Sequence, residues 1–176
     1  MKNLFEISDK IIIMINLTTP ISDDDLNKLQ IGDKITISGT LYTGRDAALP
    51  QLVELIEKNE VPFDLNGIAI MHTAFSDAGI APTTSSKVEI ESTIRPLSES
   101  GVKIHIGKGM LSDDTVKALD DNDSIFVITP PVAALLTSKV YEKKCVLFEN
   151  EGMEAMFELK VKEIPGIVAV KDGKRI

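Results

Sequence analysis

The sequence predicts an α/β fold, with a single domain over residues 1–176 that holds a mixed sheet and flanking helices. Three observations support this. Strand-like and helix-like segments alternate through the centre of the chain, both ends are rich in strand-forming residues, and no repeat, low-complexity tract or linker divides the sequence. A doubly wound parallel sheet is the competing architecture.

The predicted strands are short segments of β-branched and apolar residues bounded by turn residues. They cover residues 10–17, 34–38, 67–71, 102–106, 124–128, 145–148, 156–161 and 167–170. Pro20 breaks the chain after the first strand, and Gly32 with Asp33 forms a turn that starts the second.

The helices are predicted from capping residues and from apolar residues at helical spacing. Ser22 and Ser112 each precede acidic residues, as at a helix N-terminus. Residues 45–60 carry an apolar stripe, and their regular helix is expected to start at Pro50 because proline is tolerated only in a first turn. A pair of prolines opens a further short helix at residues 133–136.

Charge and hydropathy exclude several classes of function. The net charge is −8, with 27 acidic against 19 basic residues and no basic stripe, so no nucleic-acid partner is expected. The longest apolar run, residues 11–15, is far too short to span a bilayer, and no secretory signal is recognised. We therefore expect a cytoplasmic protein without a membrane partner.

Metal chemistry has little support within this chain. Cys145 is the single cysteine, which excludes an internal disulfide and an all-cysteine cluster site; its apolar neighbours predict a buried, unreactive strand residue. His72 and His105 lack the spaced carboxylates or thiols of a metal site, and we expect each to satisfy a local hydrogen bond. No metal ligands are predicted, and iron–sulfur chemistry would need thiolates from another chain.

Polar or glycine-bearing stretches stand where strands are expected to end, which is where α/β sheets usually bind ligands. In residues 38–48, a strand leads through glycines to Arg45 at the expected start of a helix. A guanidinium there could bind a carboxylate through two parallel hydrogen bonds. The alternatives are a surface ion pair between Arg45 and Asp46 or a simple turn.

Two further stretches share this character. Residues 81–87 contain four hydroxyl side chains, among them Thr83 and Thr84, followed by Lys87. They could bind a carboxylate, or they could form an ordinary capped loop. In residues 106–109, two glycines flank Lys108 and would allow it to point from a tight turn into a cleft, although a plain strand-to-helix turn fits equally well.

Taken in order, these stretches resemble the C-terminal half of class I, iron–sulfur fumarases and the β subunits of two-chain fumarate hydratases and L-tartrate dehydratases. The matching stretches are residues 32–48, 62–67, 82–85, 106–109, 152–155 and 164–165. The resemblance runs from about Leu29 to the C-terminus.

The resemblance implies a swivelling β/β/α domain that acts as the β subunit of a hydro-lyase. The reaction would be reversible hydration of a small dicarboxylate, with fumarate to malate as the first expectation. This chain would bind no cofactor itself, whereas a partner α subunit would carry three cysteines and a 4Fe–4S cluster.

The resemblance also assigns roles to individual residues. Arg45, Thr84, Lys87 and Lys108 would contact the substrate carboxylates. Thr83 would be the catalytic residue, beside the carbon-bound proton and coupled to an acid from the partner.

Several positions depart from the family pattern. Lys87 stands where the family has arginine, and the glycine-rich stretch before the hydroxyl loop is shortened to residues 75–80. Pro130-Pro131 replaces a pair of glycines, and Leu49 replaces a histidine. Lys87 and the shortened stretch favour an alternative hypothesis, a non-catalytic carboxylate-binding or regulatory paralogue with the same fold.

Overall fold

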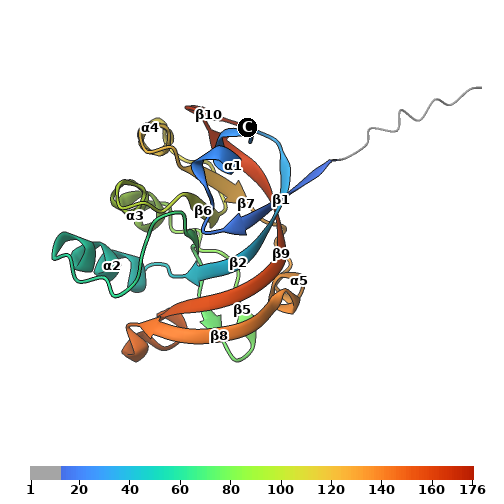
Figure 1. The fold of residues 1–176 in the computed structure, drawn as a ribbon. Coiled ribbons are helices and arrows are strands. Elements are labelled where there is room, and N and C mark those ends of the chain that lie inside the picture. Colours follow the sequence, from blue (N-terminus) through green and yellow to red (C-terminus); the bar gives the residue numbers. More distant parts are fainter. Residues whose placement is uncertain (1–12) are drawn as a thin grey trace, which may run out of the picture.

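The computed structural model describes residues 13–176 (Figure 1). Its main sheet has the strand order β1-β2-β3-β6-β7-β9-β10, with β8 paired to β9. These strands are β1 (Met14–Thr19), β2 (Lys34–Thr43), β3 (Ala69–Met71), β6 (Ile104–Gly107), β7 (Ile125–Ile128), β8 (Val140–Leu147), β9 (Met156–Lys171) and β10 (Lys174–Arg175). A separate hairpin pairs β4 (Phe75–Ser76) with β5 (Gly79–Ile80).

The main sheet is mixed and closes on itself. Strands β1, β2, β3, β6 and β7 pair in parallel, while β9 runs antiparallel to both β2 and β7. The long β9 therefore joins the two sides of the parallel layer, as Figure 1 shows. Apolar side chains from the enclosed face form the largest buried cluster, which includes Ile35, Ile37, Ile104, Ile106 and Leu159.

Three helices cover the outer face of the parallel strands, and two shorter ones pack against the enclosed cluster instead. The helices are α1 (Asp23–Asn27), α2 (Ala48–Glu57), α3 (Lys87–Glu99), α4 (Asp113–Asp121) and α5 (Ala133–Ser138), with a 3-10 segment η1 (Glu149–Glu154). Helices α2, α3 and α4 lie side by side in Figure 1. Two further apolar clusters bury the inner faces of these three helices against the sheet. Because strand side chains alternate between faces, β6 directs Ile104 and Ile106 inward and His105 towards these helices.

The prediction of an α/β fold with a mixed sheet and flanking helices is confirmed. So are both serine caps: the Ser22 hydroxyl accepts a hydrogen bond from the Asp25 amide at 3.1 Å, and the Ser112 hydroxyl accepts one from the Thr115 amide at 3.3 Å. Among residues 13–176, no helix is long and apolar enough to cross a membrane.

Several predicted element bounds were wrong. Two short strands were predicted over residues 156–161 and 167–170, but β9 is one continuous strand. It runs through Pro165, which pairs with Thr36, and the residues on either side of Pro165 pair with β2 as well. Helix α3 was not predicted. Strand β2 extends to Thr43 rather than residue 38, and α2 starts at Ala48 rather than Pro50.

The first predicted strand lies partly outside the described residues. The strand was predicted over residues 10–17, of which residues 10–12 are not described. Strand β1 begins at Met14 and continues to Thr19.

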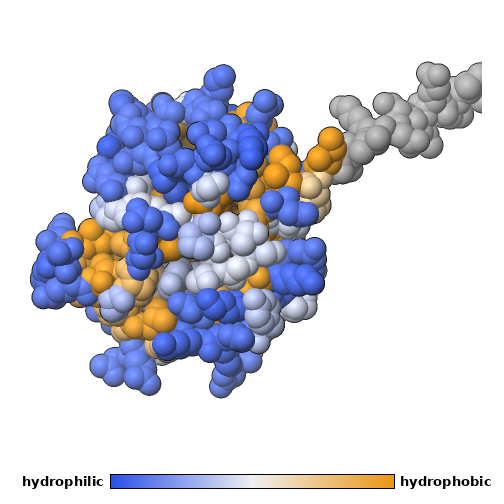
Figure 2. All heavy atoms as spheres, in the orientation of Figure 1, coloured by the Kyte–Doolittle hydropathy of each residue, from blue (hydrophilic) through white to orange (hydrophobic). Residues whose placement is uncertain are grey.

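Figure 2 shows hydrophobic residues where the described chain begins, and hydrophilic ones over α4. Ile13 is 74% exposed and Met14 is 48% exposed, so the start of β1 presents apolar surface.

Candidate functional site

The carboxyl ends of four parallel strands meet at one edge of the sheet, which we call the carboxyl edge. Strands β2, β3, β6 and β7 are neighbours in this order, so the residues that follow them reach the same edge. Arg45 follows β2, His72 follows β3, and Lys108 follows β6. The structure therefore places Arg45 and Lys108 on one edge, separated by β3.

The hydroxyl loop, residues 81–86, is held against this edge by the residues that leave β3. The Thr73 hydroxyl donates a hydrogen bond to the Ala81 carbonyl at 2.5 Å. The Thr84 amide donates to the His72 carbonyl at 2.8 Å. Loop residues distant from Arg45 and Lys108 in the sequence are thereby fixed beside the same edge.

The Thr84 side chain links the loop to the turn after β2. Its hydroxyl lies 3.3 Å from a carboxylate oxygen of Asp46 and accepts a hydrogen bond from the Ser86 amide at 3.2 Å. Thr84 is buried, with 6% of its surface exposed. This geometry gives Thr84 a role in fixing the loop, and its predicted contact with substrate stays a prediction.

Thr83 and Lys108 line the same small cavity. The cavity measures about 60 Å³, and its wall is completed by Thr129, Pro130 and Pro131 after β7. Thr83 is half-buried and Lys108 is exposed. Of the five predicted site residues, these two are brought into one cavity.

The two glycines beside Lys108 have different physical roles. A Cβ on Gly107 would lie 2.9 Å from the Phe126 ring, so a larger residue would displace a buried aromatic side chain. Gly109 has φ of +89°, which side-chain-bearing residues rarely adopt. The turn that presents Lys108 therefore depends on both glycines, as the sequence indicated.

Arg45 pairs with a residue far along the chain. Its Nε lies 2.5 Å from Oε1 of Glu154, at the end of η1, and the two side chains are 30% and 32% exposed. The alternative of an Arg45–Asp46 ion pair was therefore wrong. Arg45 also lies ahead of α2 rather than inside its first turn, with its carbonyl accepting the Leu49 amide at 2.9 Å.

Lys87 stands apart from the cavity of Thr83 and Lys108. It is the first residue of α3, its side chain is 63% exposed, and its Nζ lies 3.6 Å from Glu91 in the next turn. The Glu91 side chain is only 13% exposed. Lys87 is thus on the same side of the molecule as the hydroxyl loop, with its charge directed at a carboxylate of its own helix.

A buried histidine pair lies under the edge. Nε2 of His72 is 3.3 Å from Nδ1 of His105, and Nε2 of His105 is 2.9 Å from the Ser98 hydroxyl. Burial lowers the pKa of His72 to about 4, and burial together with His72 lowers the pKa of His105 well below its ordinary value. Both rings are therefore neutral at pH 7. The expected local hydrogen bonds are present, except that Nδ1 of His72 has no partner within residues 13–176.

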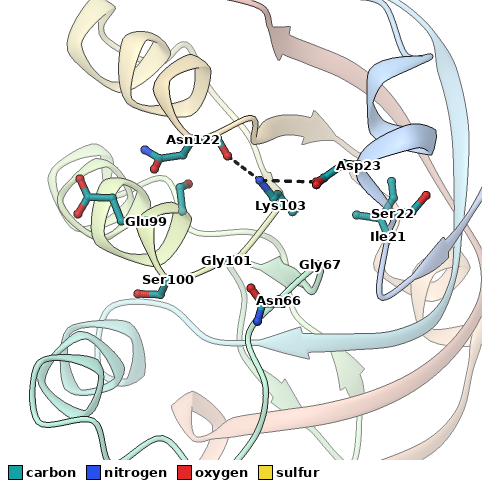
Figure 3. Close-up of a pocket in the computed structure, with 11 residues that line it drawn as sticks. Ile21, Ser22, Asp23, Asn66, Gly67, Glu99, Ser100, Gly101, Lys103 and Asn122 are labelled. Carbon is teal, nitrogen blue, oxygen red and sulfur yellow. Dashed lines mark hydrogen bonds and ion pairs between the residues drawn. The ribbon is translucent and has the colours of Figure 1, made fainter.

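A larger polar cleft, of about 520 Å³, lies at the opposite edge of the sheet (Figure 3). Lys103 points into it from the start of β6, and its Nζ lies 2.8 Å from the Asn122 carbonyl and 3.9 Å from Asp23. Because its neighbours within the chain already engage this lysine, the cleft has no free cation on its described wall. None of the five predicted site residues lines this cleft.

The chain lacks a ligand set for an iron–sulfur cluster. Cys145 is its single cysteine and lies on β8, half-buried rather than fully buried as predicted. Burial raises the pKa of its thiol, which favours the protonated form. Among residues 13–176, no group of three histidine, cysteine or acidic side chains could hold a metal ion.

Sequence reasoning missed the acidic partners of the predicted cations. Glu154 lies within the matching stretch 152–155, but no role followed from that stretch. Glu91 carried no signal beyond its charge, and Asp46 was considered only as a partner of Arg45, whereas it lies beside Thr84. Helical spacing between Lys87 and Glu91 could have indicated their pairing if α3 had been predicted.

The chain is similar to curated proteins over most of its length. It is 35% identical over 167 residues to the L(+)-tartrate dehydratase subunit beta of Escherichia coli K12, covering 88% of this chain and 81% of that protein. It is 31% identical over 163 residues to a putative L(+)-tartrate dehydratase subunit beta of Methanocaldococcus jannaschii, covering 85% and 83% of the two chains.

A relative of lower identity is named for a different activity. The chain is 27% identical over 175 residues to a putative fumarate hydratase class I of Geobacillus stearothermophilus, covering 89% of this chain and 32% of that protein. Residues 2–175 match the family described as Fumarase C-terminus. Because this match spans nearly the whole sequence, the chain belongs to the Fumarase C-terminus family.

Proposed function

We propose that this chain is the β subunit of a hydro-lyase that adds water to, or removes it from, a small dicarboxylate. The observation that carries the proposal is that Thr83 and Lys108, from two separate loops, line one cavity at the carboxyl edge. The similarity to proteins named as tartrate dehydratase β subunits supports it.

The residues of this chain suit the chemistry of the carbon-bound proton. Removing a proton next to a carboxylate builds negative charge on that carboxylate, and a fixed cation stabilises this charge. Lys108 is an exposed cation in the cavity that Thr83 lines. A threonine hydroxyl alone is a weak base, so Thr83 requires an acid–base group from the partner to share the proton.

The partner is proposed to be an α subunit that carries the 4Fe–4S cluster. When bound, such a cluster supplies Lewis-acidic iron for the substrate hydroxyl and carboxylate. This division of labour agrees with the single cysteine of this chain, which cannot ligate a cluster alone.

The surface around the carboxyl edge suits a docked partner. Val88 and Met110 are 76% and 68% exposed and lie close in sequence to Lys87 and Lys108. An apolar groove of about 390 Å³ includes Pro130 and Pro131, which also line the cavity of Thr83 and Lys108. Because the groove shares Pro130 and Pro131 with the proposed site, a subunit that covers the groove would also close the site from water.

L-tartrate and fumarate are the two candidate substrates. The relatives named for tartrate support the first, and the relative named for fumarate supports the second. Both substrates carry two carboxylates, so the cations of this chain suit either.

A specific observation favours a second function, a carboxylate-binding module without catalysis. Arg45 and Lys87 are both paired with carboxylates of their own chain. A site in which two of the three predicted cations are already engaged could retain the fold after losing turnover.

The deciding experiment is anaerobic co-purification with a three-cysteine subunit from the same genome. We expect a stable complex with bound iron and sulfide that hydrates fumarate or dehydrates L-tartrate, whereas this chain alone does neither. A complex that contains iron but turns over no substrate in a dicarboxylate panel would support the binding module. Failure of the two chains to associate would contradict the β-subunit assignment.

A further inference from the structure

We propose that Glu154 is a positioning residue for Arg45, holding the guanidinium so that its terminal nitrogens face a substrate carboxylate. The inference rests on the proposed function for the identity of the ligand. It rests on the geometry of this chain for the arrangement of the two side chains.

The contact between the two residues uses only one side of the guanidinium. Arg45 Nε is the atom that lies 2.5 Å from Glu154 Oε1. An arginine has five N–H donors, of which four are on the two terminal nitrogens. Within residues 13–176, Nη1 and Nη2 of Arg45 donate no hydrogen bond. Those two nitrogens can therefore bind both oxygens of a carboxylate end-on.

Both residues of the pair adjoin fixed parts of the chain. The Gly44 amide donates to the Met71 carbonyl at 3.1 Å, and the Leu49 amide donates to the Arg45 carbonyl at 2.9 Å. On the other side, Ala155 and Met156 follow Glu154 and are buried at 1% and 0% exposure. An ion pair between two such residues restricts the guanidinium more than an ion pair between two mobile surface side chains would.

A neighbouring contact provides a matched control. Glu151, also in η1, accepts a hydrogen bond from Gln51 Nε2 at 3.0 Å, and Gln51 belongs to α2. Glu151 therefore also fastens η1 to the start of α2, but it does not touch Arg45. If the glutamates only hold η1 in place, both variants should behave alike. If Glu154 positions Arg45, only the Glu154 variants should affect the substrate.

The kinetic arm compares three variants in the complex with the partner subunit. Glu154→Ala is expected to raise KM for the dicarboxylate about tenfold, with kcat within about threefold of the parent. The reason is that the contact of Arg45 with the carboxylate, which is made equally in the substrate and in the transition state, is weakened. Glu154→Gln is expected to raise KM less, since its amide oxygen can still accept from Nε. Glu151→Ala is expected to leave both constants unchanged.

The outcomes against the proposal are specific. A lower KM in Glu154→Ala would show that Glu154 competes with substrate for Arg45. Equal changes in Glu154→Ala and Glu151→Ala would show that the glutamate only holds η1. Either result overturns the positioning role.

The second arm uses the full chain without its partner and so does not depend on turnover. The Arg45 Nε–H signal in NMR, assigned by its loss in Arg45→Lys, is expected to be protected from exchange in the parent and in Glu151→Ala. That protection should disappear in Glu154→Ala, and unchanged protection there would overturn the inference. A separate titration uses the complex: addition of L-tartrate or fumarate is expected to shift the Arg45 Nη signals, and the absence of any shift at saturating ligand would also overturn the inference. An inactive parent complex would defeat the proposed hydro-lyase, while these signals would still decide the role of Glu154.

Discussion

The carboxylate of Glu91 accepts hydrogen bonds from the Ser112 backbone amide, at 3.1 Å to one oxygen and 3.2 Å to the other. The Ser112 hydroxyl also donates to this carboxylate, and the Thr115 hydroxyl lies 2.5 Å from it. Glu91 belongs to α3, whereas Ser112 caps α4 and ends the loop that carries Lys108. One carboxylate therefore joins the helix of Lys87 to the loop of Lys108.

Replacing Glu91 with alanine is expected to destabilise the fold by about 1–3 kcal/mol, the usual cost of losing hydrogen bonds to a charged group. Urea denaturation would measure the loss. Glu99→Ala is the matched control in the same helix, because Glu99 is 55% exposed and reaches Arg95 only at 4.0 Å. Equal free energies of unfolding for Glu91→Ala and the parent would contradict the linking role.

The same carboxylate predicts a loss of stability in acid. Burial alone would raise the pKa of Glu91, but hydrogen bonds from Ser112 and Thr115 lower it below the ordinary 4.5. Because the folded pKa is the lower one, its contribution is fully present above pH 4.5 and is lost as pH falls through the folded value. The difference in unfolding free energy between parent and Glu91→Gln should shrink from about pH 6.5 to about pH 3. A constant difference would argue against an ionised, hydrogen-bonded Glu91.

Lys108→Ala is expected to abolish hydration in the complex, with a fall in kcat of at least about 100-fold, while the fold stays intact. The reason is the loss of the exposed cation beside Thr83. Steady-state kinetics and circular dichroism would measure the two effects. Lys58→Ala, at the far end of α2, serves as a control of equal charge change. Turnover that survives in Lys108→Ala would remove this lysine from the site.

Lys87→Arg is expected to preserve or raise activity on fumarate. Arginine can bind a carboxylate through two parallel hydrogen bonds, and Glu91 in the next turn can pair with it as it does with Lys87. The measurement is kcat/KM for fumarate and L-tartrate in the complex. A large loss with both substrates would show that Lys87 is suited to another ligand.

The buried histidines predict a second, distinct pH dependence of stability. The folded pKa of His72 is about 4, below the ordinary 6.5, so the unfolded chain takes up protons that the folded chain does not. Stability is therefore fully present above pH 6.5 and falls as pH drops from 6.5 towards 4, by up to about 1.4 kcal/mol per pH unit for each histidine.

Urea unfolding of the parent and of the double variant His72→Leu, His105→Leu at about pH 7 and about pH 5 would test this. The double variant should show a smaller change between the two conditions, whatever its stability at either. Identical changes in both proteins would contradict neutral, buried histidines.

Local signals in the sequence determined much of this protein. The hydroxyls of Ser22 and Ser112 cap helices because each lies within reach of an amide in the next turn, which depends on sequence neighbours alone. The glycines around Lys108 likewise indicated its tight turn. The family, the α/β class and the stretches that carry Thr83 and Lys108 were all accessible at this level.

Only the tertiary structure decided how these stretches meet. β9 stays a single strand because it pairs with β2 and β7, whose ladders supply partners on both sides of Pro165. The pairing of Arg45 with Glu154 and the link from Glu91 to Ser112 join residues brought together by the closed sheet and the packed helices. The charge and the hydrogen-bonding capacity of a side chain follow from the residue type alone. The distance over which they act depends on long-range strand pairing and helix packing, which no local pattern encodes.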